Sequence, residues 1–189
     1  EVVLKVLPKK KLSNTIAIYT EHKKLVNELF EKVSSSCSEI SGAVYVPEEP
    51  QDKNYKHNKE MIFKFNDLDS KSSFLAFRIE GDKASIDERI KTLTNDLKLN
   101  QLNTSILDVH QSTPFWEKIN NLELFKETKN HLLRAVIPPS KGNELMKRLG
   151  NEYKYYIDWC GSLYWIEVQS KKNMKITEIK KLIKELGGY

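Results

Sequence analysis

The order of amphipathic segments along the chain is the sequence feature that most constrains its fold. Alternating apolar residues predict strands, and apolar residues at spacings of three and four predict amphipathic helices. By these criteria, six segments follow one another as strand, helix, strand, strand, helix and strand. They are residues 14–20, 21–34, 39–46, 73–80, 84–97 and 103–109.

The same order begins a second time in the C-terminal part of the chain. Its segments are a strand at 131–137, a helix at 140–149, strands at 153–159 and 163–168, and a helix at 175–186. The short link at 160–162 predicts an antiparallel hairpin. Strand-helix-strand-strand-helix-strand is the order of the ferredoxin-like unit. We therefore predict an α+β fold of two ferredoxin-like halves that share an antiparallel sheet, with helices packed on one face. The second half lacks its last strand, which could begin at 187–189.

Three further segments complete the predicted organisation. Residues 1–8 form a short strand that ends at a proline, and residues 61–65 form a strand before a polar turn. Residues 114–121 form a helix in which Pro114 suits the first turn and Ser112 or Thr113 is placed to cap it.

Composition narrows the class of protein and of partner. The chain has 189 residues, of which 39% are hydrophobic, enough for a folded core. No apolar run approaches the roughly 20 residues of a membrane span. The formal net charge is +5, but 27 of the 31 basic residues are lysines spread along the chain, whereas phosphate and base recognition favours arginine. We therefore expect no nucleic acid partner. A cytoplasmic location is expected on a separate ground, since two cysteines without a disulfide framework suit a reducing cytosol.

The sequence holds no recognisable metal or nucleotide motif. Cys37 and Cys160 are too few for a disulfide framework, and no cysteines or histidines have zinc spacing, so free thiols and no metal site are expected. Neither a GxGxxG nor a Walker A pattern occurs. A phosphate-binding loop for a nucleotide cofactor is therefore not predicted within this chain.

Five segments, taken together, resemble a known family. They are EVVLKVLP at 1–8, FRIEG at 77–81, PFWE at 114–117, HLLRAVIPP at 131–139, and YIDWCG at 156–161 running into LYW at 163–165. They resemble the C-terminal half of the FAD-binding (E) subunit of bacterial glycolate oxidase, which belongs to the FAD-linked oxidases of the vanillyl-alcohol oxidase type.

The resemblance implies a domain organisation and a function. Residues 1–10 would be the end of an N-terminal FAD-binding domain, and 11–189 the C-terminal cap domain, with halves at 11–110 and 111–189. FAD would be held mainly by the absent domain, so we expect this chain to be inactive alone. The whole subunit would oxidise 2-hydroxy acids such as glycolate by hydride transfer to flavin. Its partners would be the other subunits of a glycolate oxidase-like complex, through which it could associate with the inner membrane.

Two other functions fit parts of the sequence. The chain could be a non-catalytic assembly module that docks the partner subunits of such a complex. An RNA-binding pair of ferredoxin-like halves is disfavoured, because FLAFR at 74–78 lacks the glycine and the basic residues of an RNA-binding strand.

Arg78 and Arg134 are the candidate cofactor-binding residues. Arg78 shares one strand face with Phe74, Ala76 and Glu80. It would stabilise a reduced, anionic flavin or bind a substrate carboxylate, or else form an ordinary salt bridge with Glu80. Arg134 lies in the apolar run LLRAVI, where a charge is costly unless it is paired. Asp158 could pair with it, either to orient Arg134 at the flavin or as a buried structural ion pair.

The candidate substrate-binding residues surround Asp158 in the sequence. They are Asp158, Trp159, Tyr156 and Trp165. The aromatic residues, together with Trp116, Tyr153 and Tyr155, could line a pocket, although aromatic residues on strands more often pack in a core. Cys160 has no feature that would activate a thiol, and His57 lies in a polar loop. No catalytic residue is predicted in this chain.

Overall fold

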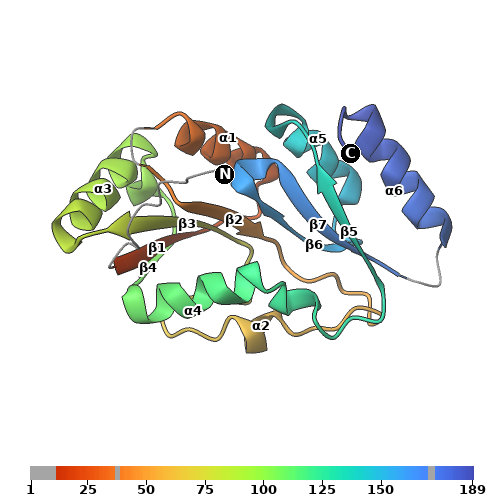
Figure 1. The fold of residues 1–189 in the computed structure, drawn as a ribbon, viewed down its shortest axis with the longest axis horizontal. Helices are drawn as coiled ribbons and strands as arrows, with labels where there is room; N and C mark the ends of the chain where they lie inside the picture. Colours follow the sequence, from red (N-terminus) through yellow and green to blue (C-terminus); the bar gives the residue numbers. More distant parts are fainter. Residues whose placement is uncertain (1–11, 37–38, 170–172) are drawn as a thin grey trace, which may run out of the picture.

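The computed structural model describes residues 12–36, 39–169 and 173–189, the side chains of 173–175 excepted. Its centre is a sheet of seven antiparallel strands in the order β4-β1-β3-β2-β6-β7-β5 (Figure 1). The strands are β1 Leu12–Tyr19, β2 Gly42–Val46, β3 Phe74–Gly81, β4 Thr104–Leu107, β5 His131–Val136, β6 Lys154–Asp158 and β7 Leu163–Val168. The predicted strand at residues 1–8 and the thiol of Cys37 lie outside the described residues.

The sheet consists of two groups of strands that meet at one place. β1 to β4 pair with one another, as do β5 to β7, and β6 and β7 form the predicted antiparallel hairpin. The groups join where β2 runs beside β6, with Tyr45 opposite Ile157. Beyond β5, Tyr189 exchanges two backbone hydrogen bonds with Val136, at 2.9 and 3.0 Å. An α+β architecture with one antiparallel sheet is therefore confirmed.

Four of the longer helices cover one face of the sheet. They are α1 Lys23–Ser34, α3 Lys83–Asp96, α5 Gly142–Leu149 and α6 Asn173–Glu185 (Figure 1). Alternation along β1 points Ile16 and Ile18 toward this side, where they are buried with the apolar stripe of α1, including Leu29 and Phe30. Burial of these stripes against the strands forms the larger of two hydrophobic cores.

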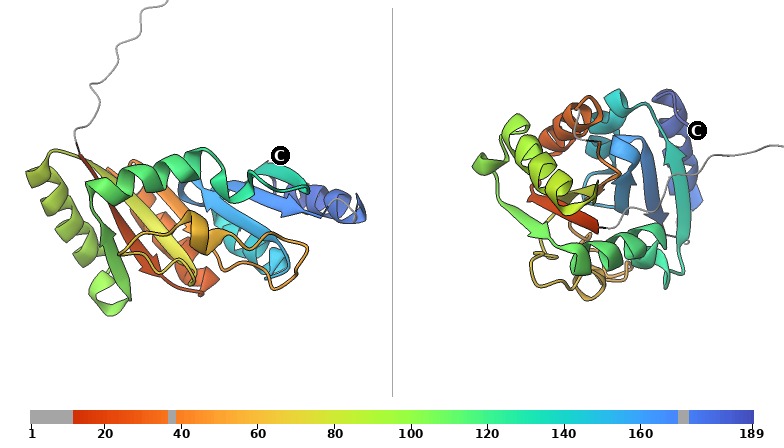
Figure 2. Two further views of the ribbon diagram at one scale, coloured as in Figure 1. Left: turned by 90° about the horizontal axis from the view of Figure 1, so that it is seen from below. Right: turned by 60° about the vertical axis from the view of Figure 1, so that its left-hand side comes forward.

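The opposite face is covered as well, so the prediction of helices on one face only is wrong. α4 Val109–Asn120 and the short α2 Lys59–Ile62 lie across it, as the view from below in Figure 2 shows. The strands of the first group are apolar on both faces, and Ala17, Val44 and Ala76 on this side would otherwise be exposed. Phe115 and Trp116 of α4 pack over them and form the second core.

Two local predictions are corrected by the same packing. Residues 61–65 are not a strand, because both edges of β3 already pair with β1 and β2; instead Phe63 packs against Phe115, with 5.5 Å between ring centroids. The fourth helix begins earlier than predicted, because Asp108 caps it by accepting from the backbone N–H groups of His110 and Gln111. Ser112 does not cap this helix. Its hydroxyl is buried and bonds the Thr15 hydroxyl at 2.7 Å.

The described residues hold neither a membrane-spanning helix nor a metal-binding cluster of side chains. No helix in the described ranges is long and apolar enough to cross a membrane. Likewise, in these ranges no group of three or more histidine, cysteine, aspartate or glutamate side chains is arranged to hold a metal ion.

Candidate functional site

Three of the predicted site residues line one cavity. Arg78, Asp158 and Trp159 meet at a hollow of about 250 Å³, at the end of the sheet junction where β2 begins and β6 ends. The remaining wall is formed by residues from α4, from β2 and from the turns beside them. These residues are Ile40, Ser41, Gly42, Ala43, Trp116, Asn120 and Cys160. We call this hollow the arginine cavity.

Arg78 is held rigidly in the wall of the arginine cavity. Its Nε donates to the Ser41 hydroxyl at 3.1 Å and its Nη2 to the Ser41 carbonyl at 2.9 Å. The Glu80 carboxylate is a further 3.7 Å from Nε, so the predicted Arg78–Glu80 salt bridge is present, but it is long and partly exposed. The cavity therefore contains a positive charge whose orientation is fixed by hydrogen bonds before any ligand binds.

Trp116 provides the flat apolar surface next to this charge. The guanidinium of Arg78 lies 5.0 Å from the Trp116 ring centroid, within the range of a cation–π interaction. The Trp116 indole N–H donates to the Thr15 hydroxyl at 2.8 Å, which ties α4 to β1. Trp116 is thus both a core residue and part of the cavity wall, and the sequence alone favoured only the first role.

The turn after β6 brings Trp159 and Cys160 to the cavity. Trp159, Cys160 and Gly161 have φ values of +51°, +50° and +92°, a left-handed run that is unfavourable for the first two residues. The Asp158 carboxylate accepts from the Trp159 backbone N–H at 2.7 Å and stabilises the turn. Backbone strain of this kind often occurs at functional sites, and here it presents the Trp159 ring with 57% of its surface exposed.

Burial raises the pKa of two groups in this turn, the Asp158 carboxyl and the Cys160 thiol. Desolvation raises the pKa of the Asp158 carboxyl, opposed by the Trp159 N–H and by the charge of Arg78. Burial, with a smaller contribution from Asp158, also raises the pKa of the Cys160 thiol. A raised pKa keeps the thiol protonated near neutral pH, which disfavours Cys160 as a nucleophile.

Arg134 contacts the Trp159 ring, but it neither lines the arginine cavity nor pairs with Asp158. β7 separates β5 from β6, so Arg134 is opposite Trp165 rather than beside Asp158. The Arg134 side chain is exposed, and its guanidinium lies 5.4 Å from the Trp159 ring centroid. The predicted ion pair is therefore not formed. The charge avoids burial by projecting over an aromatic ring at the surface.

Tyr156 and Trp165 line none of the cavities described for this structure. Tyr156 is buried, donates its hydroxyl to the Ile119 carbonyl at 2.9 Å and stacks on Phe125 with centroids 5.5 Å apart. Trp165 is half-buried and packs against the same core. The packing role that aromatic strand residues usually have accounts for both positions.

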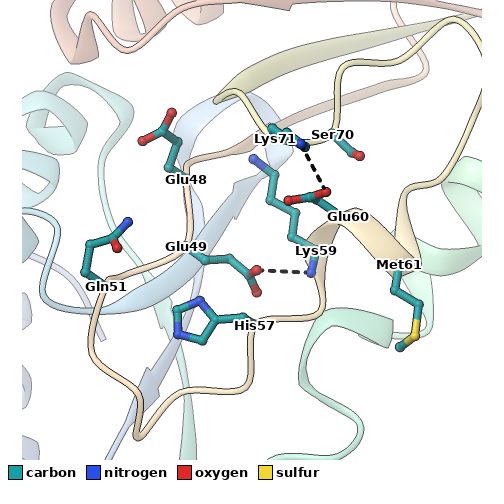
Figure 3. A pocket seen from close by; sticks show the side chains of 9 residues that line it. All are labelled: Glu48, Glu49, Gln51, His57, Lys59, Glu60, Met61, Ser70 and Lys71. Carbon is teal, nitrogen blue, oxygen red and sulfur yellow. Dashed lines mark hydrogen bonds and ion pairs between the residues drawn. The ribbon is translucent and has the colours of Figure 1, made fainter.

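A larger cavity of about 450 Å³ was not foreseen from the sequence. It is lined by Glu48, Glu49, Gln51, His57, Lys59, Glu60, Met61, Ser70 and Lys71 (Figure 3). Figure 3 shows the Glu49 carboxylate directed at the backbone of Lys59 and the Glu60 carboxylate directed at Lys71.

The amino group of Lys59 is the unusual group of this region. The side chain is buried, its Nζ donates to the Ser72 carbonyl at 2.7 Å, and it lies 5.0 Å from the Phe74 ring centroid. Burial lowers the pKa of Lys59 to about 8, against the opposing effect of Glu49. No sequence signal marked it, because the surrounding stretch is uniformly polar.

Comparison with known proteins identifies the fold. No protein-family model and no curated protein matches the chain. Among solved structures, p-cresol methylhydroxylase with substrate bound superposes with a TM-score of 0.57 and 12% identity, covering 95% of this chain and 43% of that one. Alkyldihydroxyacetonephosphate synthase gives a TM-score of 0.54 and 16% identity, covering 94% and 39%.

The chain therefore spans less than half the length of either protein. At these identities the likeness establishes a shared fold: the chain is folded like one part of p-cresol methylhydroxylase and of alkyldihydroxyacetonephosphate synthase.

Proposed function

We propose that this chain is the cap domain of an FAD-dependent oxidoreductase subunit, composed of two ferredoxin-like halves. The fold is shared with parts of two proteins that are FAD-binding flavoproteins of the vanillyl-alcohol oxidase type. The first group of strands supports the first half. Its strands lie side by side in the order β4-β1-β3-β2, with α1 between β1 and β2 along the chain and α3 between β3 and β4. The five family-like sequence segments support the same assignment.

The observation that carries the proposal is the arginine cavity. A flavin ring is planar and aromatic, and its pyrimidine edge carries acceptor oxygens and gains negative charge on reduction. The fixed guanidinium of Arg78 and the adjacent Trp116 ring match that chemistry. A hollow of about 250 Å³ would contact only one edge of such a ring, so the remainder of FAD would be held by another domain.

The roles of this chain's residues follow from their positions. FAD, when bound, would supply the hydride acceptor. Arg78, held by its bonds to Ser41, would place a fixed positive charge at the ring edge, where negative charge develops on reduction. Trp159, which lines the cavity, and Arg134, whose guanidinium lies over the Trp159 ring, would contact a carboxylate-bearing substrate. Asp158 would keep the turn in place through its bond to the Trp159 N–H.

The proposal also includes a substrate class and partner subunits. We infer a 2-hydroxy acid such as glycolate, and partner subunits of a glycolate oxidase-like complex, from the family-like segments. The two exposed or half-exposed arginines, Arg134 and Arg78, agree with a substrate that bears a carboxylate.

The experiment uses the whole gene product with the FAD-binding domain that the proposal requires. The purified protein should carry flavin absorbance, and glycolate should bleach it. Arg78→Met should slow bleaching by at least about tenfold, because a charge-assisted contact to the developing anion is lost. Arg148→Met, an exposed arginine on α5, is the matched control and should bleach at the wild-type rate.

Two results would contradict the proposal. One is a whole protein that binds no flavin. The other is an Arg78→Met protein that is folded, carries flavin and is bleached as fast as the Arg148→Met control.

A further inference from the structure

A third cavity lies at the opposite end of the β2–β6 junction from the arginine cavity. It has a volume of about 260 Å³ and lies where β2 ends and β6 begins, between the first turn of α1 and the end of α5. Its walls combine charged, hydroxyl and aromatic groups. They come from Glu21, Lys23, Tyr45, Pro47, Glu48, Ser73, Gly150, Asn151, Tyr153 and Tyr155. We call it the tyrosine cavity.

The Tyr155 hydroxyl is the first sign of a ligand. Tyr155 has 2% of its surface exposed, and its buried hydroxyl makes no hydrogen bond to any residue that the structure describes. The neighbouring buried tyrosines differ: Tyr164 donates to the Gly142 carbonyl at 3.2 Å and Tyr156 to the Ile119 carbonyl at 2.9 Å. A buried polar group without a partner is costly and rare in native proteins. A bound molecule that accepts a hydrogen bond would remove that cost.

Charges of both signs face the same cavity without neutralising each other. Glu21 and Glu48 are exposed in its wall, and both carboxylates act on the Tyr45 hydroxyl, whose pKa burial and these charges raise to about 12. Lys23 is half-buried, its Nζ donates to the Met146 carbonyl at 3.2 Å, and burial lowers its pKa. Within the described ranges of the chain, Lys23 forms no ion pair with either carboxylate.

We propose that the tyrosine cavity binds a zwitterionic amino acid. Its ammonium group would lie at Glu21 and Glu48, and its carboxylate would accept from Lys23 and from the Tyr155 hydroxyl. Its side chain would pack on the apolar surfaces of Tyr45, Tyr153 and Pro47. A volume of about 260 Å³, slightly below the about 300–1,000 Å³ of pockets for drug-sized ligands, suits a smaller molecule such as an amino acid.

The wall composition excludes simpler ligands by their charge. An amine without a carboxylate would bring a second positive charge to Lys23 and leave the Tyr155 hydroxyl with a poor partner. A carboxylic acid without an ammonium group would meet Glu21 and Glu48. Only a molecule with both groups satisfies the whole wall. This inference does not depend on the proposed flavoprotein function, because the two cavities lie at opposite ends of β2 and β6.

The first test is calorimetric titration of the purified chain with L-alanine, L-leucine and L-glutamine. At least one should bind. The tightest binder is then compared with the amine and the acid obtained by removing its carboxylate or its ammonium group, and each fragment should bind at least about tenfold more weakly. Failure of all three amino acids to bind at millimolar concentrations, or equal binding of either fragment, would overturn the proposal.

The second test uses two variants, each of which lacks one tyrosine hydroxyl of the wild-type protein. Tyr155→Phe removes the unpartnered hydroxyl, so it should weaken amino acid binding at least about tenfold while leaving the melting temperature unchanged or higher. Tyr164→Phe, the control, loses a bonded hydroxyl and should lower the melting temperature without weakening binding. A Tyr155→Phe protein that binds like wild type, or melts as early as the control, would show that the hydroxyl has a structural rather than a ligand-binding role.

Discussion

Glu49 and Lys154 form an ion pair in the protein interior, with 2.8 Å between the Glu49 Oε1 and the Lys154 Nζ atoms. Both partners have further bonds. The Glu49 carboxylate accepts from the backbone N–H groups of Asn58 and Lys59, and Lys154 donates to the Asn58 side chain and the Lys56 carbonyl. The pair therefore fastens the segment between β2 and β3 to the start of β6.

Removal of one partner should destabilise the fold strongly. Lys154→Met leaves a largely buried carboxylate without its cation, for which a loss of about 3–5 kcal/mol in the free energy of unfolding is expected. Chemical denaturation of the 189-residue chain measures this loss. The double variant Glu49→Gln, Lys154→Met should lose less than the sum of the single variants. Strict additivity would mean that the two groups do not interact energetically.

Lys59 should make stability depend on pH in the alkaline range. Its pKa is lowered by burial to about 8 from an ordinary value of 10.5, so above about pH 8 the unfolded chain binds more protons than the folded one. Stability from this group therefore rises with pH, by about 2 kcal/mol between about pH 7 and about pH 9.5. Denaturation midpoints at a series of pH values measure the rise.

The variant Lys59→Met isolates this effect. It lacks the titrating group, so wild type should gain stability relative to Lys59→Met as the pH rises toward 9.5, by about the same 2 kcal/mol. Tyrosines of the unfolded chain begin to ionise in this range, since their ordinary pKa is 10.0, but they are present in both proteins and cancel in the difference. A difference that stays constant with pH would mean that Lys59 is not desolvated in the folded protein.

Asp158 should make the folded protein less stable as the pH rises, whereas a carboxylate in an ion pair usually makes it more stable. Burial raises its pKa, so between its ordinary value of 3.8 and its folded value the native state binds the proton more tightly. Its contribution to stability is present below about pH 4 and is lost as the pH rises through the folded pKa. Asp158→Asn keeps an acceptor for the Trp159 N–H and removes the charge.

The variant Asp158→Asn should therefore gain stability relative to wild type as the pH increases from about 4 to about 7. Thermal unfolding at these two pH values is sufficient to detect the gain. A relative loss would show that the carboxylate charge is stabilised at this position, by Arg78 above all.

Alanine substitutions at Gly161 and Gly150 should distinguish the cost of backbone strain from the cost of steric overlap. Both have positive φ, at +92° and +59°, but an added Cβ would lie 3.2 Å from the Phe30 ring at Gly161 and would meet nothing within 4 Å at Gly150. Gly150→Ala should cost about 1–3 kcal/mol from strain alone, because its φ of +59° and ψ of −139° are nearly confined to glycine, and Gly161→Ala should cost about 1–2 kcal/mol more because Phe30 must also move. Equal losses in urea denaturation would show that the turn accommodates the methyl group freely.

Local sequence patterns predicted most of the elements correctly. Alternation along residues 73–80 placed Phe74, Ala76 and Arg78 on one face of the third strand, and in the structure that face packs under α4. Such periodicity is a property of a few consecutive residues, so it can be read without knowledge of the fold. The segment at 61–65 has the same apolar character but lies as helix and turn, because both edges of the neighbouring strand β3 are occupied by β1 and β2.

Which residues form the candidate sites was decided by the tertiary structure. Arg78, Trp116 and Asp158 meet because β2 pairs with β6 and α4 crosses the sheet, contacts between segments far apart in the chain. The same pairing order inserts β7 between β5 and β6 and so prevents the predicted contact of Arg134 with Asp158. Lys59, Lys154 and Tyr155 are ordinary residues in the sequence. Their burial beneath other segments, which sequence periodicity does not encode, gives them their unusual energetics.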